Sequence, residues 1–529
     1  IKYFCTPCAK TITNGGRTRN LPEHDPAKWE LFVEYNRQDV VTEMEIERRL
    51  SRFPVPEQVQ REWEYDMRIS ARGVAADREL VDGALYCGTA IEEAAKQEAI
   101  ELTGLENPKS REQMLTWLQG HGVAIPDLRS ATVEDALEHK DEFEPDVARV
   151  LELRQLLSKA SIKKYSTVVT TMCEDGRIRG LLQFYGANRT GRWAGRLVQV
   201  QNLPRTYLHG AMLDTARDLT RRKLPEGLKL LYGSVPGTLS QLVRTALVPR
   251  PGCKFVDADF SAIEARVVAW LAGEEWVLQV FRTHGKIYEA TASQMFGVPL
   301  DRIVKGNPEY ALRQKGKVAT LALGYQGGSS ALIAMGALKN GLTEEELPDI
   351  VSRWRQANRA IVRCWKAVEQ AAIQAVETGR SCATHGLVFA READIDSGLD
   401  FLTIRLPSGR KLYYAQPHFG VNQWGGKQLR YYGMNQMTKK WSVIETYGGH
   451  MTENIVQAIA RDCLAVNIER LENAGFPIVF HIHDEVVIEV PEDRADLDEV
   501  TRIMGQPIEW APGLPLAADG WVGDYFTKD

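Results

Sequence analysis

The segment 478–490, IVFHIHDEVVIEV, places His483, Asp484 and Glu485 in the middle of an otherwise apolar run. Its β-branched side chains are typical of a buried strand. An ionised carboxylate is costly in such surroundings unless it is paired or bound to a metal ion. The pattern therefore indicates two strands joined by a tight turn, with Asp484 at the turn, where a cation could approach it.

A second pair of acids stands in FVDADFS at 255–261, another apolar run. Side chains alternate along a strand, so Asp257 and Asp259 point to the same face, and Asp259 lies at the strand's end. If this strand neighbours the 478–490 hairpin, Asp259 and Asp484 meet at one edge of a sheet. Two adjacent carboxylates repel each other unless a cation lies between them.

The chemistry that such a pair supports is metal-assisted displacement at phosphorus. Carboxylate oxygens with open coordination positions suit Mg²⁺ and phosphate. Two metal ions ~4 Å apart can activate a 3′-hydroxyl and stabilise the leaving oxygen of an in-line displacement. We therefore expect Asp259 and Asp484 to bind two Mg²⁺ ions, for which Mn²⁺ could substitute. The competing interpretation is that both acids are ordinary turn residues.

The run 312–328, LRQKGKVATLALGYQGG, repeats a different pattern. Arg313, Lys317, Leu321 and Tyr325 recur every four residues and form one slowly drifting stripe on a helix. The stripe begins basic and ends apolar, as a nucleoside triphosphate site requires, with cations toward the phosphates. Lys317 could also donate a proton to leaving pyrophosphate. The competing interpretation is an amphipathic helix with two solvated cations.

The elements that must position these residues can be read coarsely from the pattern. A helix over 26–50 follows Asp25 as N-cap, and RFPVPEQ at 52–58 marks a boundary. Residues 59–170 look mostly helical, including a helix that begins with a capping box of Ser110 and Gln113.

The remainder of the chain mixes the two element types. Residues 276–440 are predicted to be mainly helical, apart from a hairpin that turns at Ser408–Gly409, and a further helix is predicted over 452–475. An acid-bearing strand on each side of this long insertion indicates one sheet with an inserted domain.

Length and composition set outer bounds. A chain of 529 residues calls for several domains, and 44% hydrophobic with 26% charged residues is an ordinary soluble composition. No apolar run reaches the ~20 residues of a membrane span, and we expect no membrane partner. The chain opens with Ile1, which we take to indicate a fragment or processed product. A net charge of −5 excludes no partner, because an acidic chain can carry a basic groove.

Cysteine usage favours a reducing compartment, because most of the eight cysteines are isolated. Cys5 and Cys8 form a single C-x-x-C pair. A structural zinc site needs about four ligands, and no second pair follows nearby.

Three motifs stand in a familiar order: DFSAIEAR at 259–266, RQKGKVATLALGY at 313–325 and HDE at 483–485. With TGRWAGRLVQVQNLP at 190–204 and QAIARD at 457–462, they give the chain a close resemblance to family A DNA polymerases. The resemblance is to DNA polymerase I-like enzymes of the phage type. It implies a multidomain α+β right hand, with an antiparallel sheet in the palm and a helical thumb and fingers.

The resemblance also implies a division of the chain. In order, the expected parts are a remnant of a 3′–5′ exonuclease domain (1–55), palm entry (56–80), thumb (81–177), palm with the first catalytic motif (178–275), fingers with the nucleotide-binding helix (276–440) and palm with the HDE motif (441–529).

The family pattern assigns roles to the acids and their neighbours. Asp259 and Asp484 would bind the metal ions, with the Phe260 carbonyl as an extra ligand. Glu485 would support the site, and His483 would lie near the primer terminus.

Further roles follow from the same resemblance. Glu264 would be the steric gate against a ribose 2′-hydroxyl. Arg192 and Gln457 would contact minor-groove acceptors, which are nearly the same for every base pair. Arg266 would pair with Glu264 or the primer strand, and Tyr325 would stack near the templating base.

Three positions depart from the family pattern. Leu321 stands where well-known members carry Phe or Tyr, and the missing hydroxyl predicts discrimination against dideoxynucleotides. Tyr288 stands where many members place a His beside the triphosphate, and its phenol could bind a phosphate oxygen without charge. Gln326 replaces the usual Gly after Tyr325.

The segment YNRQD at 35–39 resembles the last motif of a proofreading exonuclease. The earlier D-x-E motif of that domain does not occur in the chain. One carboxylate cannot hold two metal ions, so we expect Tyr35 and Asp39 to be inactive and proofreading to be absent.

The resemblance predicts a template-directed DNA polymerase that adds dNTPs to a primer 3′-hydroxyl, in phage replication. Its partners would be primer-template DNA and dNTPs, with unknown accessory proteins. We expect a monomer in the cytoplasm of a bacterial host. A single-subunit RNA polymerase-like enzyme is an alternative that Glu264 argues against. A non-catalytic primer-template clamp would not need both Asp259 and Asp484, and a nuclease-centred repair protein would need the missing D-x-E motif.

Overall fold

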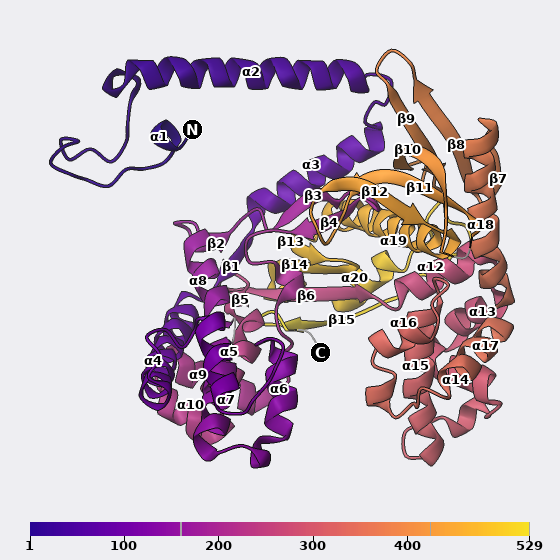
Figure 1. Ribbon diagram of the computed structural model, residues 1–529. Coiled ribbons are helices and arrows are strands. Elements are labelled where there is room, and N and C mark those ends of the chain that lie inside the picture. The colour runs from indigo at the N-terminus through magenta and orange to yellow at the C-terminus, as the bar shows by residue number, and fades with distance from the viewer. Residues whose placement is uncertain (159–160, 424, 528–529) are drawn as a thin grey trace.

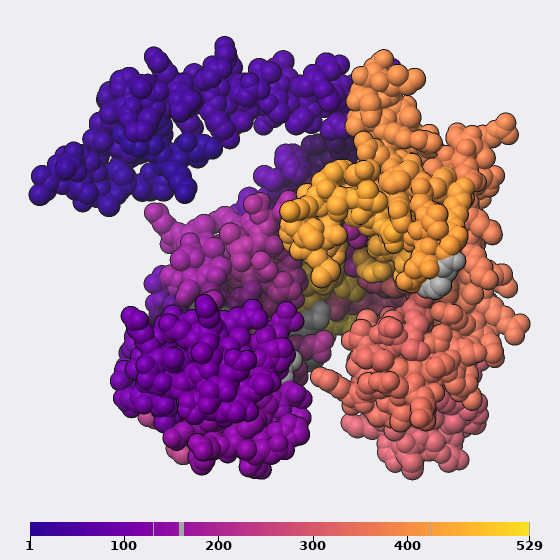
Figure 2. Space-filling view, viewed as in Figure 1, coloured from indigo at the N-terminus to yellow at the C-terminus, as the bar shows by residue number. Residues whose placement is uncertain are grey.

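The computed structural model describes residues 1–158, 161–423 and 425–527. Two helical lobes extend from a central group of sheets and leave a space between them, and one long helix projects away at the N-terminal end (Figure 1). In the space-filling view the two lobes flank a deep hollow (Figure 2).

The central sheet carries the predicted acid-bearing strands as neighbours. Its four strands are antiparallel and run in the order β13-β14-β6-β15. Their bounds are Ile478–Ile482 for β13, Glu485–Pro491 for β14, Cys253–Phe260 for β6 and Ala518–Gly523 for β15. The predicted hairpin and the predicted single sheet interrupted by an insertion are both confirmed.

The unbroken apolar runs in these strands have a physical cause. Successive side chains of a strand point to opposite faces, and here each face is covered. Val486 and Ile488 pack into the larger of two cores, while Val487 and Phe480 pack into the other. The helix α19 (Gly448–Asn473), predicted over 452–475, contributes much of the larger core.

The first helical lobe lies at the lower left of Figure 1. Its elements are α4 (Arg78–Thr103), α5 (Arg111–Gly120), α6 (Ser130–Glu138), α7 (Pro145–Ser158), α8 (Ser161–Thr171), α9 (Gly210–Arg221), α10 (Pro225–Tyr232) and α11 (Val235–Leu242). Leu80 of α4, Leu213 of α9 and Leu239 of α11 share one core, although the expected thumb ends at 177.

The second helical lobe lies at the lower right of Figure 1. It contains α13 (Glu275–Thr283), α14 (Ile287–Phe296), α15 (Leu312–Leu323), α16 (Ser329–Ala334) and α17 (Leu347–Ala357). Helices α12 (Ile263–Ala272) and α18 (Arg359–Thr378) pack against each other and connect this lobe to α19.

A six-stranded antiparallel sheet occupies residues 382–446, where mainly helical structure was predicted. Its strands, in the order β12-β11-β10-β9-β8-β7, are β7 (Cys382–Thr384), β8 (Leu387–Asp394), β9 (Leu399–Arg405), β10 (Lys411–Val421), β11 (Lys427–Met434) and β12 (Trp441–Thr446). The prediction is wrong here except for the β9–β10 hairpin, which does turn at Ser408–Gly409. One face of this sheet buries Leu402, Tyr414 and Tyr431 in the larger core, and that tertiary contact stabilises strands of weak local signal.

Two smaller sheets complete the fold. Three short strands form the sheet β2-β1-β5, and two form a hairpin. Their bounds are β1 (Val74–Ala76), β2 (Arg177–Ile178), β5 (Leu247–Val248), β3 (Leu182–Ala187) and β4 (Arg192–Gly195).

The two predicted helix caps, at Asp25 and Ser110, are confirmed in part. Asp25 accepts a hydrogen bond from the Lys28 backbone N–H at the start of α2 (Pro26–Leu50). The Ser110 hydroxyl caps α5, but the Gln113 side chain accepts from Asn107, so the predicted box does not close. After the 52–58 boundary the chain continues in α3 (Glu57–Arg72).

Helix α2 buries none of its residues, and the side chains at positions 35 and 39 are exposed on it. The absence of proofreading stays a prediction. All eight cysteines are free thiols. Among the described helices, none combines the length and apolar character that crossing a bilayer requires.

Candidate active site

The two predicted metal-binding acids lie side by side at the end of the central sheet. Asp259 is directly opposite Glu485 in the pairing of β6 with β14. The next residue, Phe260, donates its backbone N–H to the carbonyl oxygen of Asp484, with 3.2 Å between nitrogen and oxygen. Strands roughly 225 residues apart in the chain therefore bring both carboxylates to one edge, as predicted.

The turn between β13 and β14 consists of His483 and Asp484. His483 has a left-handed backbone, with φ at +54°, a conformation that His tolerates better than most residues. The turn leaves His483 exposed and Asp484 half-buried, while Glu485 is buried inside the sheet. Only the first two can face a ligand, so Glu485 fits a supporting position.

A further carboxylate adjoins this pair. Asp519 on β15 lies opposite Asp259 on the other side of β6, and its side chain accepts a hydrogen bond from the Ser261 hydroxyl at 2.7 Å. No local sequence motif marks Asp519, because its position follows only from the pairing of the last strand.

The donor chemistry of this edge fits a hard divalent cation. Within the described part of the chain, no group of three or more His, Cys, Asp or Glu side chains is arranged to hold a metal ion. Magnesium in phosphoryl-transfer sites needs no such cage, because one or two carboxylates suffice when water and substrate phosphates complete its shell. Asp259 and Asp484, with the backbone at Phe260 between them, supply such a set.

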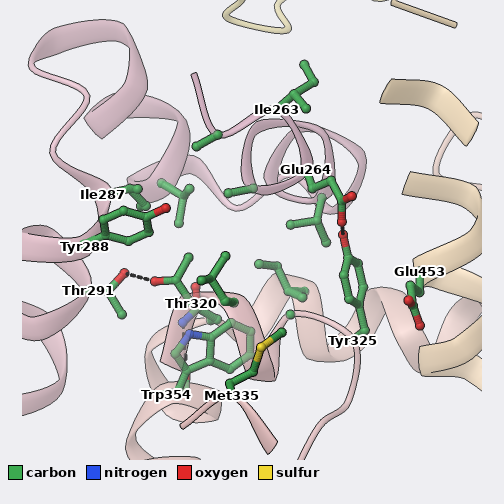
Figure 3. Close-up of a pocket in the computed structure, with 18 of the residues that line it drawn as sticks. Ile263, Glu264, Ile287, Tyr288, Thr291, Thr320, Tyr325, Met335, Trp354 and Glu453 are labelled. Atoms are coloured by element: carbon green, nitrogen blue, oxygen red, sulfur yellow. Dashed lines mark hydrogen bonds between the residues drawn. The ribbon is translucent and has the colours of Figure 1, made fainter. Parts of the chain in front are cut away.

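A cavity of about 400 Å³ opens beside Asp484, between α12, α14, α15 and α19. Figure 3 shows Glu264, Tyr325 and Glu453 at one end and Tyr288 at the other. Six predicted site residues share its lining: Asp484, predicted to bind metal, and five predicted to contact nucleotide or DNA, namely Glu264, Tyr288, Leu321, Tyr325 and Gln457.

Glu264 is fixed at this cavity by two partners. Arg192 donates to one carboxylate oxygen at 2.6 Å. The Tyr325 hydroxyl donates to the other at 2.7 Å, as Figure 3 shows. Burial and the Glu264 carboxylate raise the pKa of Tyr325 well above its usual value, so the phenol stays protonated and remains a donor. The carboxylate of Glu264 therefore has a defined position on the first turn of α12.

Glu453, on α19, adds a second carboxylate that sequence reasoning missed. It accepts a hydrogen bond from Gln457, one helical turn later, and both side chains line the cavity. Burial, followed by the nearby Glu264, raises the pKa of Glu453. The sequence did contain a signal for Glu453, because a residue four positions before Gln457 lies on the same face of a helix.

The basic half of the α15 stripe lies against α14. Arg313 forms an ion pair with Glu289 at 2.8 Å, so this cation is already neutralised in the structure. Lys317 places its ammonium 5.9 Å from the centre of the Tyr288 ring, and within the described residues it makes no ion pair. Lys317 and Tyr288 therefore stand together, as the phosphate-binding prediction requires.

The apolar half of the stripe differs slightly from its prediction. Leu321 is 46% exposed and lines the cavity. Helix α15 ends at Leu323, so Tyr325 lies beyond the helix instead of on its stripe. Its hydroxyl bond to Glu264 holds the ring at the cavity wall.

Arg266 does not occupy its expected position. Its guanidinium donates to the backbone carbonyls of Ser261 and Pro515 and lies over the Phe281 ring, with only 4% of the residue exposed. The predicted pairing with Glu264 is wrong, because Arg266 points from the opposite side of α12 into the core. A side chain as buried as that of Arg266 cannot contact a primer strand.

Gln326 also has a defined role in the structure. Its backbone is left-handed, with φ at +65°, and its side-chain carbonyl accepts the N–H of Gly449 at 3.0 Å. Gly449 is the second residue of α19, whose N-terminus has no cap from Tyr447. Gln326 therefore caps α19 from the segment that follows α15.

Comparison with known proteins agrees with this geometry. A family model described as DNA polymerase family A matches residues 87–387, more than half of the chain. A DNA polymerase of Bacillus phage SP02 is 52% identical over 530 residues, which cover all of this chain and 80% of the phage protein. The thermostable DNA polymerase I of Thermus aquaticus is 26% identical over 293 residues, 54% of this chain and 28% of that enzyme.

A solved structure shares the fold. The polymerase domain of Pol1 from M. smegmatis, in complex with a DNA primer-template and dNTP, superposes with a TM-score of 0.58 at 18% identity. The match covers 90% of this chain and 72% of that chain. At this identity the likeness supports the arrangement of lobes and sheets alone. The family-model match ends before the 478–491 hairpin, which the phage match includes.

Proposed function

This chain belongs to DNA polymerase family A, and on that premise we propose that it is a template-directed DNA polymerase that extends a primer 3′-end with dNTPs. The observation that carries the proposal is the adjacency of Asp259 and Asp484 beside a cavity lined by Glu264, Leu321 and Gln457. The first helical lobe would serve as thumb and the second as fingers, with the central sheet as palm.

Enzymes of this family use divalent metal ions, and we infer two Mg²⁺ ions here. Asp259 and Asp484 would hold them, with the Phe260 carbonyl as an additional ligand. When bound there, the ions would lower the pKa of the primer hydroxyl and neutralise charge that develops on the phosphates. Glu485, buried in the sheet opposite Asp259, would keep the edge rigid.

The residues around the cavity would bind and orient the nucleotide. Lys317 would contact the triphosphate, and its ammonium could give a proton to the leaving pyrophosphate. Arg313 would need to exchange its partner Glu289 for phosphate, which places that contact in a rearranged state of α15 and α14. Tyr288 lies close enough to both cations to bind a phosphate oxygen as a neutral donor.

Selection of the sugar and the base pair would come from the other end of the cavity. The carboxylate of Glu264 is held where it would exclude a ribose 2′-hydroxyl, since Arg192 and Tyr325 fix both of its oxygens. Gln457 and Arg192 would contact the minor groove of the newest pair. His483, exposed at the turn, would lie near the primer terminus.

The test is primer extension with Mg²⁺ and each dNTP, comparing the chain with Asp484→Ala. We expect the substitution to lower the extension rate roughly 10³-fold, because one carboxylate cannot hold the metal ions that supply several kcal/mol. Asp493→Ala removes an exposed acid just beyond the same hairpin and is the matched control, with an unchanged rate.

Two readouts make the experiment decisive. Primer-template affinity, measured by fluorescence anisotropy, should remain in Asp484→Ala, which separates lost chemistry from lost folding. Replacing dNTPs by rNTPs should suppress extension, as Glu264 requires. Unchanged extension by Asp484→Ala would falsify the assignment of the catalytic edge.

A further inference from the structure

The outermost three strands of the six-stranded sheet present a face that the active site does not use. Paired residues of antiparallel strands point to the same side of a sheet. Trp441 of β12 lies opposite Met434 of β11, and Val443 lies opposite Tyr432. We define the outer face as Trp441, Val443, Met434, Tyr432, Arg430 and His418.

This face is apolar and aromatic, with three of its six residues exposed and Tyr432, Arg430 and His418 half-buried. Trp441 is 61% exposed, Met434 44% and Val443 42%. The rings of His418 and Tyr432 lie 5.7 Å apart on the same surface. Contiguous exposed apolar groups on neighbouring strands mark an interaction surface, whereas scattered ones do not.

The charge beside the outer face is positive. Lys439 and Lys440 are exposed in the turn between β11 and β12, and within the described residues neither makes an ion pair. Glu445 faces the same side, but Arg430 neutralises it at 2.7 Å. Protein–protein interfaces are depleted in lysine. Lysines beside an aromatic face therefore favour a polyanion that carries flat apolar groups as the ligand of this face.

The outer face is joined to the catalytic cleft through a short connection in the chain. Strand β12 ends at Thr446, and α19 begins two residues later and carries Glu453 and Gln457 into the cavity. The eight Cα–Cα steps from Trp441 to Gly449 span at most about 27 Å. In Figure 2 these strands form the orange block above the hollow between the lobes.

We propose that the outer face binds single-stranded DNA that continues from the cleft, with bases stacked on Trp441 and Tyr432 and phosphates at Lys439 and Lys440. The inference rests on the proposed polymerase function, which places unpaired DNA at this cleft. Exposed aromatic rings bind single strands because every base has a free face to stack, whereas duplex DNA keeps its bases inside. The strand that we propose is the unpaired template ahead of the cavity, and a displaced strand is the alternative that the extension substrates below test.

Binding is tested directly with a fluorescent oligo-dT of twenty nucleotides, without catalysis. Trp441→Ala and the pair Lys439→Glu with Lys440→Glu should each weaken its binding roughly tenfold, and the lysine variant should flatten the salt dependence. Trp63→Ala removes another exposed tryptophan, on α3, and is the matched control with unchanged binding.

Two extension substrates then identify the source of the strand. If it is the template, Trp441→Ala slows extension on a twenty-nucleotide overhang and spares a two-nucleotide overhang. If it is the displaced strand, the same variant slows extension only through a downstream duplex. Oligo-dT affinity that is unchanged in both variants would overturn the proposal, as would a change in self-association without one in DNA binding. A failed polymerase assignment would instead abolish extension on every substrate.

Discussion

Glu264 shows how single residues set the properties of this site. Its two oxygens are held by Arg192 and Tyr325, so a side chain of three rotatable bonds has one position. The hydrogen bond from Tyr325 depends on a protonated phenol, and burial raises the pKa of that phenol well above its usual value. The gate proposed for Glu264 is therefore maintained by neighbours that need not touch the sugar.

Leu321 carries a prediction about nucleotide choice. It is half-exposed at the cavity and has no hydroxyl to replace the one that a dideoxynucleotide lacks. Leu321→Tyr should raise dideoxynucleotide incorporation relative to dNTP by roughly ten- to a hundredfold, the worth of one hydrogen bond to a charged group. Leu321→Phe is the control and should resemble the unsubstituted chain. Efficient dideoxy incorporation by the unsubstituted chain would contradict the prediction.

Asp66 carries a prediction about pH. It lies on α3 with 6% of its surface exposed and accepts a hydrogen bond from Trp193 at 2.9 Å. Burial raises its pKa from 3.8 to about 6, against the smaller opposing effects of Trp193 and Arg461. The folded state therefore binds this proton more tightly than the unfolded state, and unfolding free energy falls as pH rises from about 4 to about 6.

Asp66→Asn keeps the acceptor oxygen and removes the titration. The variant should be more stable than the unsubstituted chain at pH 8, by up to about 3 kcal/mol, with the gap closing below pH 4. Denaturant unfolding at a series of pH values measures this difference. A gap that stays constant across the series would show that Asp66 does not titrate as its burial implies.

Among the elements, the contact between the segment after α15 and the start of α19 connects the proposed nucleotide-binding helix to the proposed palm. Gln326 makes that contact and accepts the Gly449 N–H from a left-handed backbone. A Cβ on Gly449 would lie 2.5 Å from the Tyr325 carbonyl oxygen, so the two segments meet without space for a side chain. Tyr325 immediately precedes Gln326, and Glu453 lies on α19 just after Gly449. The relative positions of these two cavity residues therefore depend on this contact.

Gln326→Gly relieves the left-handed backbone but removes the cap. We expect kcat/KM for the correct dNTP to fall by roughly five- to tenfold, since one hydrogen bond contributes about 1 kcal/mol. Gln326→Glu retains an acceptor oxygen near the positive end of α19 and should stay close to the unsubstituted value. Equal losses in the two variants, or a matching loss of thermal stability, would speak for a structural role only.

The elements also show what the sequence could and could not predict. Strand β6 and the β13–β14 hairpin were predictable because acids inside apolar runs are a local signal, and so was α19. The six-stranded sheet was missed because its strands are stabilised by burial against the larger core, which no local pattern reveals. Arg266 was misplaced for a related reason, since its motif fixes its position on α12 but not the direction in which its side chain points. Asp519 needed the register of β15.

For the whole molecule, the hollow between the two lobes determines how DNA should bind. The net charge of −5 does not itself attract DNA. The attraction to DNA phosphates must therefore come from lysines and arginines in the cleft. Primer-template affinity should fall steeply with salt, by roughly 10³-fold between 50 and 200 mM if about six phosphates are contacted. Anisotropy titrations at several salt concentrations give the slope. A slope near zero would mean that phosphate contacts do not hold the duplex.

The position of β6 in the central sheet has a consequence for how the enzyme is made. Both strands that flank it, β14 and β15, are synthesised roughly 225 or more residues later. Pairings so distant in the chain are slow to form, because a long loop must close first. A chain still on the ribosome can therefore fold its first lobe before Asp484 has been synthesised to pair with the strand of Asp259. Competence for catalysis should therefore arrive only after β14 has been synthesised and has paired with β6, so chains that have not reached β14 cannot act on nucleotides.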